Sequence, residues 1–543
     1  MQNAFRLMTA LAAVYFLAGC HSAEEYREER VEKARKHFEE INKKVIVKGK
    51  VFTLPMCIRT ALKHNLDLKV YELKERIAQE KVTASMLGML PDLEISNQFH
   101  ARNRTPGSSS QSIETGKQSL VSSRSTDNTI NNIKIELALS VVDFGLAYLN
   151  AAQAEDRSLI TVEQQRRAAQ NLTLDVVKTY FKVAAAQDAI QTTEKLLVKC
   201  RNLEKVFATL SQSKAVSPLR LLDERKRFIQ LEKRLMAYRR SYQNACIELR
   251  ALMGYLPIND VRVDTRCLEQ LNVATLPDIS VLEKIALVER PELYQLDIQT
   301  NITVNEARKT ILMMFPNVKM FVDFVNSNNS FLYTQSWWEI GVRAAYNLLK
   351  LPEQIARYRA INSQVDEISM RTLALSIGVM AQVRIAHANI LEVKERFELD
   401  DKVYKAYSDH LNVAKKNYSA GSGLSQLELD RLELETAETF INRIISMSNY
   451  YVAYYRLLNT VGISSLDQKT IGDIIHEIKL SEAKEKARTT RTSPAMVQAR
   501  KAFNKNVLSF NGIALGQNTM TSDDRKKLEA LIPKNTRKES GVL

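Results

Sequence analysis

The feature that most constrains this chain is a long internal repeat. Residues 61–68 (ALKHNLDL) return as residues 286–293 (ALVERPEL), and residues 90–93 (LPDL) return as residues 315–318 (FPNV) at the same spacing. A period of this length is far longer than that of a solenoid and indicates the duplication of a whole half-domain. Each copy has the same order of patterns: a helix, a proline, two alternating segments, a very long helix, a short tip and a last helix.

The N-terminus has the pattern of an export signal that is removed from the mature protein. Residues 7–18 form an apolar segment that is too short to span a bilayer as a helix, and the sequence Leu-Ala-Gly-Cys that ends at Cys20 is typical of lipoproteins. We predict a lipoprotein signal peptide at residues 1–19 and a lipid anchor on Cys20; an ordinary secretory signal with a chance cysteine is the alternative. His21 replaces the aspartate that favours retention in the inner membrane, which favours the outer membrane. No later segment has 18 uninterrupted apolar residues, so no transmembrane helix is expected.

Each repeat contains two segments in which apolar and polar residues alternate. Each segment has about ten residues, the length that a tilted strand needs to cross a bilayer. Their polar positions carry charges that a packed core would not accept but a water-filled barrel lumen would: Lys134, Glu136, Lys319, Asp323, Glu339 and Arg343. A soluble sheet with one wet face is the alternative. Four strands are too few to close a barrel, so several copies of the chain would have to share one.

The helical segments have matched lengths. Residues 146–213 and 353–419 contain no strong helix breaker, and at 1.5 Å per residue each would form a helix about 100 Å long. Leading helices are expected at residues 54–90 and 281–315, and return helices at residues 218–253 and 426–461. Because one leading and one return helix stacked end to end match one long helix, each half offers two antiparallel columns, with strands at one end and a tip at the other.

This order of elements resembles the TolC family of outer-membrane efflux and secretion channels over residues 50–463. The resemblance rests on the repeated motifs above, on Asp143-Phe144-Gly145 after the second strand, and on Gly254 and Gly462, which close the two halves. It implies a mainly α fold with a membrane β-barrel portion. Duplicated TolC-like half-domains would supply long antiparallel coiled-coil helices for a trimeric α-barrel tunnel and four β-strands per protomer for a shared outer-membrane β-barrel.

The resemblance also implies a domain order. After the signal peptide, it predicts a lipid-anchored tether at residues 20–53, a first repeat at 54–262, a second repeat at 263–463 and a basic periplasmic extension at 464–543.

A periplasmic gate is implied at the hairpin tips. Tyr418 stands three residues before Gly421, as in many family members. Asp430 matches the farther of the two acidic positions expected beyond it, whereas Leu427 occupies the nearer one, with Glu428 beside it. Three copies of one carboxylate at a constriction would favour cations; a solvated helix face is the alternative explanation of these acidic residues. Docking of an adaptor protein is expected at Ala215, Val216, Ser217, Pro218, Gly421, Ser422, Gly423 and Leu424.

The chain departs from the family pattern at three places. The first tip lacks a glycine, Pro352 replaces the junction glycine before the second long helix, and Gly423 stands where some members have a basic residue.

Several function classes find no support in the sequence. It has no HExxH motif, P-loop, GxGxxG or GxSxG, and none of its seven histidines pairs with a cysteine at zinc spacing, so no enzyme, cofactor or metal is expected. The net charge of +15 is concentrated in residues 484–543, which hold 13 Lys and Arg against 5 Asp and Glu. We therefore expect a contact with an anionic envelope component, or a loosely wrapped tail, rather than binding to nucleic acid. The remaining cysteines are expected to be small apolar residues or free thiols, with a disulfide as the alternative: Cys57, Cys200, Cys246 and Cys267.

The function expected from the resemblance is that of the outer-membrane channel in a tripartite efflux or secretion system. The channel would be a homotrimer in outer-membrane lipid, and its partners would be a periplasmic adaptor (membrane fusion) protein and an inner-membrane transporter of the RND, ABC or MFS type. The alternative is a non-conducting periplasmic coiled-coil scaffold lipoprotein. A scaffold has no use for charged residues opposite a lipid-compatible face, so the strands favour the channel.

Overall fold

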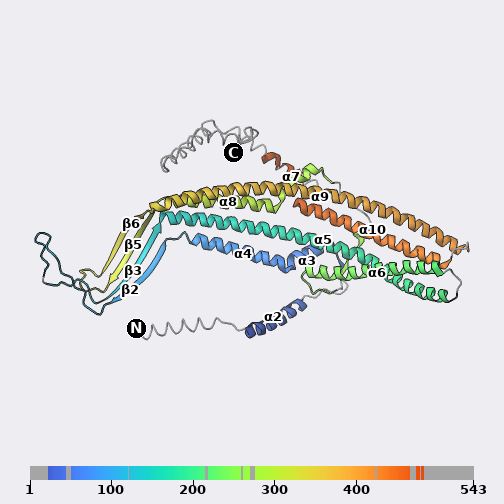
Figure 1. Ribbon diagram of the computed structural model, residues 1–543, viewed down its shortest axis with the longest axis horizontal. Helices are drawn as coiled ribbons and strands as arrows, with labels where there is room; N and C mark the ends of the chain where they lie inside the picture. The colour runs from blue at the N-terminus through green and yellow to red at the C-terminus, as the bar shows by residue number, and fades with distance from the viewer. Residues whose placement is uncertain are drawn as a thin grey trace, which may run out of the picture. The chain divides into compact units, whose positions relative to one another are not determined.

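The computed structural model describes residues 23–43, 51–119, 121–213, 218–258, 261–268, 276–421, 425–464, 472–476 and 478–481. The chain divides into two compact units, residues 1–466 and 467–543, and the labelled elements all belong to the first (Figure 1). The charged segment after the predicted anchor is helix α2 (Ala23–Lys43), and it carries the i, i+4 ion pairs Lys33–Glu29 and Lys36–Glu32.

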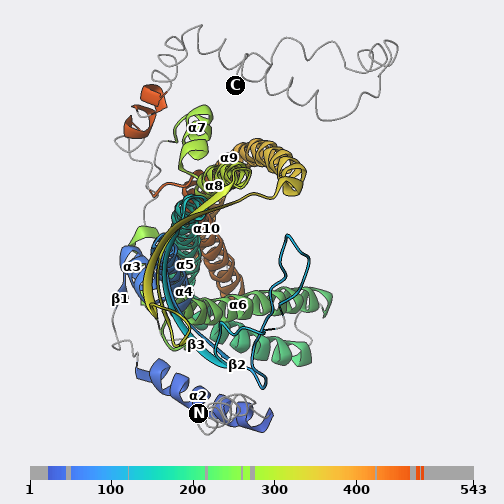
Figure 2. The same cartoon turned by 90° about the vertical axis from the view of Figure 1, so that its left-hand side faces the viewer.

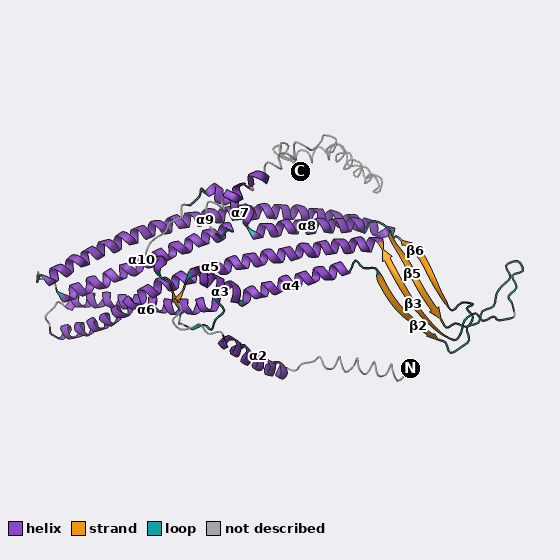
Figure 3. Cartoon of the chain, turned by 180° about the vertical axis from the view of Figure 1, so that it is seen from behind, coloured by secondary structure: helices purple, strands orange, loops and turns teal. Residues whose placement is uncertain are grey.

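Two very long helices run from the sheet to the tips (Figures 1 and 3). Helix α5 (Val141–Ser213) has 73 residues and helix α9 (Leu351–Ser419) has 69, which confirms both long helices. Helix α5 begins earlier than predicted because the Asp143-Phe144-Gly145 segment is helical rather than a junction. The hydroxyl of Ser140 accepts a hydrogen bond from the backbone N–H of Asp143, which satisfies one donor of the first turn.

Four helices of about half this length form the other columns. Helices α4 (Leu66–Leu87) and α6 (Pro218–Leu252) both pack on α5. Helices α8 (Pro291–Leu312) and α10 (Gln426–Val461) both pack between α5 and α9. The layer therefore has the predicted four columns, in the order α4 with α6, α5, α8 with α10, and α9.

Each leading helix is broken in two, which the sequence analysis did not predict. Helix α3 (Leu54–His64) ends at Asn65, which caps α4: its side-chain oxygen accepts from the N–H of Leu68 at 3.1 Å. Helix α7 (Ile279–Glu289) ends at Arg290, and the next residue, Pro291, has no N–H for an intrahelical bond and so favours a new helix start.

The same two breaks join each leading helix to its return helix. The amide of Asn65 donates to the carbonyl oxygen of Leu252 at the end of α6, at 3.2 Å. In the second half the guanidinium of Arg290 donates to the carbonyl oxygen of Thr460 near the end of α10, at 3.0 Å. A side chain of the leading column thus satisfies a helix C-terminus of the return column, and the two helices stack end to end.

The hydrophobic core lies around this joint. Val176, Tyr180 and Ala184 of α5 are buried there together with Leu249 of α6. The Tyr180 hydroxyl donates to the carbonyl oxygen of Asp264 at 2.8 Å, just beyond a short parallel pair of strands, β1 (Val51–Phe52) and β4 (Arg262–Val263).

The four predicted long strands form one antiparallel sheet in the order β2 (Asp92–Ala101), β3 (Thr129–Ser140), β5 (Asn317–Ser327) and β6 (Ser336–Ala345). Seen from its end, the sheet is curved (Figure 2). Strands β2 and β6 are its edges, so each has a row of backbone groups without a partner strand in this chain.

Within the described residues, one helical stretch has the length and composition of a membrane span. It is Leu348–Ser419, whose most apolar window has a mean hydropathy of 1.3 and is 22 % buried. This stretch contains α9, which packs along α8 and α10.

Candidate functional site

Strand pairing places every charge predicted for a barrel lumen on one face of the sheet. In the antiparallel register Glu136 lies opposite Asp323, and Asp323 lies opposite Glu339, while alternate residues along each strand share their side. This face, called the polar face below, carries Lys134, Glu136, Lys319, Asp323, Glu339 and Arg343. Glu94 of β2 lies opposite Glu136 and belongs to the same face.

An ion-pair network links β3 and β5 across this face. The ammonium of Lys134 lies 2.6 Å from a carboxylate oxygen of Glu136 and 2.8 Å from one of Asp323, and the ammonium of Lys319 lies 2.6 Å from the other oxygen of Glu136. The guanidinium of Arg343 lies 5.4 Å from the centre of the Phe321 ring, a cation–π distance. Charged side chains are thus held by one another rather than by an apolar core.

On the central strands β3 and β5, exposure of the two faces is the reverse of that in a soluble sheet. On the apolar face Leu137 is 45 % exposed and Met320 is 44 % exposed, whereas Asp323 on the polar face is 2 % exposed. A soluble antiparallel sheet packs its apolar face on the core and leaves its polar face in water. The arrangement here suits lipid on one side and a polar lumen on the other. Trp338, packed 5.2 Å from the Phe324 ring, is exposed on the apolar face like an interfacial aromatic.

The second hairpin tip contains the predicted gate residues. Tyr418 is partly exposed near the end of α9, and Gly421 has a φ of 74°, which favours glycine. Ser425 and Glu428 form a capping box: the N–H of Glu428 donates to the Ser425 hydroxyl at 3.2 Å, and the N–H of Ser425 donates to the Glu428 carboxylate at 3.1 Å. The Glu428 carboxylate therefore stabilises the start of α10.

Asp430 is not a free carboxylate in the protomer. It is 8 % exposed, and it accepts hydrogen bonds from Gln426 at 2.9 Å and from the ammonium of Lys199 at 2.6 Å. Lys199, on α5, also lies 2.5 Å from a carboxylate oxygen of Glu433, which pairs with Lys415 of α9 at 3.0 Å. Three helices are joined at this cluster.

Sequence reasoning missed Lys199, because a lysine on a long helix is ordinarily solvated and its partners are distant in the chain. Burial disfavours its charged form, but hydrogen bonds with Asp430 and Glu433 outweigh this and raise the pKa of Lys199. Burial likewise opposes the charge of Glu433, yet hydrogen bonds from Lys199 and Lys415 prevail and lower the pKa of Glu433. Lys199 and Glu433 are therefore both charged at neutral pH.

Two further contacts join the first hairpin to the second. Arg234 of α6 lies 2.7 Å from a carboxylate oxygen of Glu438 on α10, and the Tyr238 hydroxyl donates to Asn442 of α10 at 3.1 Å. With Lys199, these contacts tie both arms of the first hairpin to α10.

Some predicted site residues lie outside the described part of the chain: Cys20, Ala215, Val216, Ser217, Ser422, Gly423 and Leu424. Pro218 is the first residue of α6, and Pro352 stands in the first turn of α9, where the lack of an N–H costs no helical hydrogen bond. Cys57 and Cys246 are buried in the core and form no disulfide with a described residue, and burial raises the pKa of Cys57 to about 12, so its thiol stays protonated. The side chains of Cys200 and Cys267 are outside the described set.

Long helical columns that continue into a small sheet with an exposed apolar face define a TolC-like outer-membrane channel fold. Residues 57–255 match the family described as outer membrane efflux protein. The resemblance to the TolC family and the predicted fold class are thereby confirmed.

Solved structures of outer-membrane channels share this fold. OprN has a TM-score of 0.59 and 15 % identity, over 76 % of this chain and 90 % of that chain. The open state of MtrE from Neisseria gonorrhoeae has a TM-score of 0.60 and 16 % identity, over 76 % and 89 %. VceC from Vibrio cholerae has a TM-score of 0.56 and 12 % identity, over 76 % and 96 %. A comparison with curated proteins gives no match.

Proposed function

We propose that the protein is the outer-membrane channel of a tripartite efflux or secretion system. It is anchored in the outer membrane through Cys20, extends into the periplasm, and conducts substrates passively without chemistry of its own. The main support for this function is the sheet with two different faces: its apolar face is exposed, while Asp323 on its polar face is buried.

The edges of the sheet suit closure by three copies. Neighbouring strands are antiparallel throughout, so β6 of one copy can pair with β2 of the next in the same sense. Three copies of a four-stranded sheet give a closed barrel of twelve strands, an even number with no free edge.

The edge helices support the same closure. Exposed apolar stripes lie on both edge helices: Val70, Leu73 and Ile77 on α4, and Met370, Leu373 and Ile377 on α9. Apolar rows at helical spacing on both edges are expected where the α9 edge of one copy packs on the α4 edge of the next.

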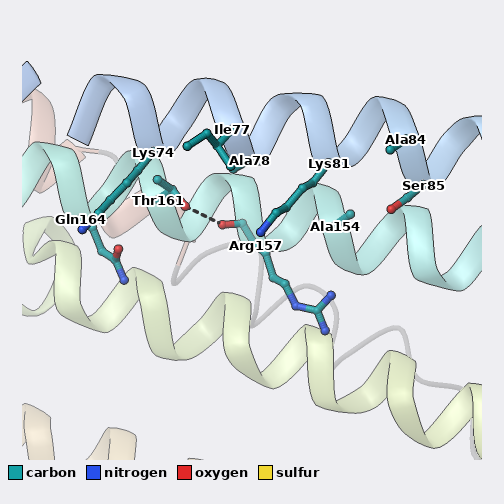
Figure 4. A pocket seen from close by; sticks show the side chains of 10 residues that line it. All are labelled: Lys74, Ile77, Ala78, Lys81, Ala84, Ser85, Ala154, Arg157, Thr161 and Gln164. Atoms are coloured by element: carbon teal, nitrogen blue, oxygen red, sulfur yellow. Dashed lines mark hydrogen bonds between the residues drawn. The ribbon is translucent and has the colours of Figure 1, made fainter. Parts of the chain in front are cut away.

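A groove of about 630 Å³ runs beside the α4 stripe, between α4 and α5 (Figure 4). Its charged lining residues are Lys74, Lys81 and Arg157, and Figure 4 shows the side chain of Lys81 extending from α4 toward α5. Helix α9 carries exposed Asp366 and Glu367 next to its own stripe. Charge complementarity therefore favours a second copy of this chain as the neighbour of α4.

At the tips, an adaptor would dock on the segments around residues 215–218 and 421–424, and an inner-membrane transporter would supply the substrate. Tyr418, Gly421, Glu428 and Asp430 would form the gate at this end. Lys199 of α5 forms ion pairs with Asp430 and Glu433 of α10. These ion pairs, called the tie below, join the two hairpins of each protomer and keep the gate closed.

Replacing Lys199 by alanine is expected to raise the open probability of the channel, because α10 loses its ion pairs to α5. Single-channel recording of the trimer in a planar bilayer measures this. Lys195→Ala is the matched control, since Lys195 is an exposed lysine one turn away without an ion pair among the described residues. An unchanged open probability in Lys199→Ala would remove this residue from the gate.

The same tie has a defined pH dependence. The pKa of Glu433 in the folded protein lies below its ordinary value of 4.5, so the link is present at neutral pH and is lost only as pH falls through that lowered pKa. Wild-type open probability should therefore stay low between neutrality and about pH 5, and rise in more acidic solution.

Conduction by the purified full-length protein tests the proposed function itself. Reconstituted alone or with an adaptor, it should insert into a planar bilayer and give discrete ion-conducting events. A protein that forms the trimer but neither inserts nor conducts would support the scaffold alternative instead.

A further inference from the structure

Four carboxylates lie in one row across the polar face. Glu94 of β2 is paired in register with Glu136 of β3, Glu136 with Asp323 of β5, and Asp323 with Glu339 of β6. Side chains directly opposite on neighbouring antiparallel strands are about 5 Å apart at Cβ, and like charges there are destabilising. All four strands of the sheet nevertheless place an acidic residue at this level.

The two lysines of the polar face neutralise only the middle of the row. Lys134 binds Glu136 and Asp323, and Lys319 binds the second oxygen of Glu136. Glu94 and Glu339, at the two ends, have no ion pair within the described residues and are exposed. Four carboxylates against these two ammonium groups and the guanidinium of Arg343, which is paired in register with Lys319, leave a net charge of about −1 in each copy.

A second observation points to a cation at the same row. Asp323 is 2 % exposed, and one of its carboxylate oxygens is buried without a hydrogen-bond partner, although the other binds Lys134. An anionic oxygen buried without a donor carries a desolvation cost that an approaching cation would relieve. The row is therefore not a self-contained salt-bridge network.

We propose that Glu94, Glu136, Asp323 and Glu339 form a cation-selecting band in the barrel lumen, so that inorganic cations and cationic substrates pass in preference to anions. This inference rests on the proposed channel function. Three copies would bring twelve carboxylates against six lysines and three arginines around one pore, where walls of low dielectric constant focus the field of the excess negative charge.

The geometry indicates attraction without tight binding. The row runs perpendicular to strands that tilt by about 35–45° in such barrels, so the band consists of three oblique stripes rather than one flat ring. Among the described residues no group of three or more His, Cys, Asp or Glu side chains could hold a metal ion. Cations would thus be concentrated and released along each stripe, as conduction requires.

The test measures the reversal potential of the full-length trimer in a planar bilayer with a KCl gradient. The wild-type channel is expected to be cation-selective, and the double variant Glu94→Gln with Glu339→Gln is expected to lose most of that preference while its conductance persists. These two positions are chosen because both side chains are exposed and have no ion pair with any described residue, so neutral amides leave the network of Lys134 undisturbed.

Matched controls separate the band from other charges. Glu114→Gln removes an exposed carboxylate from the β2–β3 connection and should leave the selectivity unchanged. Asp430→Asn reports the contribution of the helical tips. A conducting wild-type channel that prefers anions, or a double variant with wild-type selectivity, would overturn the band while leaving the channel function intact. Failure of the wild-type protein to conduct would instead refute the channel.

Discussion

Replacing Leu73 by aspartate is expected to abolish the trimer while leaving the protomer folded. Leu73 lies on the exposed stripe of α4 and is 55 % exposed, so the folded protomer does not depend on it. In a trimer it would be covered by α9 of the neighbouring copy. The variant would lose roughly 1.5–3 kcal/mol of leucine burial and would bury an unpaired carboxylate at a further cost of several kcal/mol, at each of three interfaces.

Size-exclusion chromatography with light scattering measures the result, and circular dichroism confirms the helix content. Thr83→Asp is the control, since it places the same carboxylate on an exposed flank of α4. Ile377→Asp on α9 should have the same effect as Leu73→Asp, because the interface joins two different surfaces. A mixture of the two variants retains one intact α4–α9 pairing and should stop at dimers. Intact Leu73→Asp trimers would show that α4 is not at the interface.

The second large effect is expected from Gly254→Ala at the joint between α3 and α6. Gly254 has a φ of 73°, and an added Cβ would lie 2.5 Å from the carbonyl oxygen of His64. The left-handed conformation alone costs roughly 1–3 kcal/mol for alanine, and the clash with backbone must move α3 away from α6. Because this joint lies within the core, the midpoint of thermal unfolding should fall strongly, or the protein should not accumulate.

Alanine substitutions at two other glycines separate the cost of the left-handed conformation from the cost of the clash with His64. Gly421→Ala meets the same left-handed strain with no atom within 4 Å, so its loss should be smaller. Gly378→Ala lies inside α9 with open space around it and should stabilise the helix by about 0.5–1 kcal/mol. Circular dichroism at 222 nm during heating gives the midpoint of thermal unfolding of each of the three variants. Equal midpoints for Gly254→Ala and Gly421→Ala would mean that the contact with His64 is unimportant.

Much of the fold could be predicted from local patterns. The period-2 alternation of Leu93, Ile95 and Phe99 identified β2, and the absence of breakers over 353–419 identified α9, because side-chain period and backbone propensity act within a few residues. The breaks at Asn65 and Pro291 were missed although both residues belong to the repeated motifs. Their capping role became visible only where each break meets the end of its return helix.

The candidate site was predicted in part for the same reason. Alternation along single strands assigned Lys134, Glu136 and Asp323 to one face, and the strand pairing agrees. The alignment of Glu94 with Glu339 depends on the register of strands that lie far apart in the sequence, and a shift by one residue would place them on opposite faces. Lys199 could not be found at all, since no local pattern marks a helical lysine as the partner of Asp430.

The sequence by itself determined the duplication, the lengths of the helices and strands, the polarity of each strand face and the resemblance to outer-membrane channels. Only the tertiary structure decided which surfaces meet: the end-to-end joints at Asn65 and Arg290, the tie between α5 and α10, and the row of four carboxylates. The physical reason is the distance along the sequence over which each effect acts. Periodicity and capping are properties of neighbouring residues, whereas register and ion pairing depend on residues that folding alone brings together.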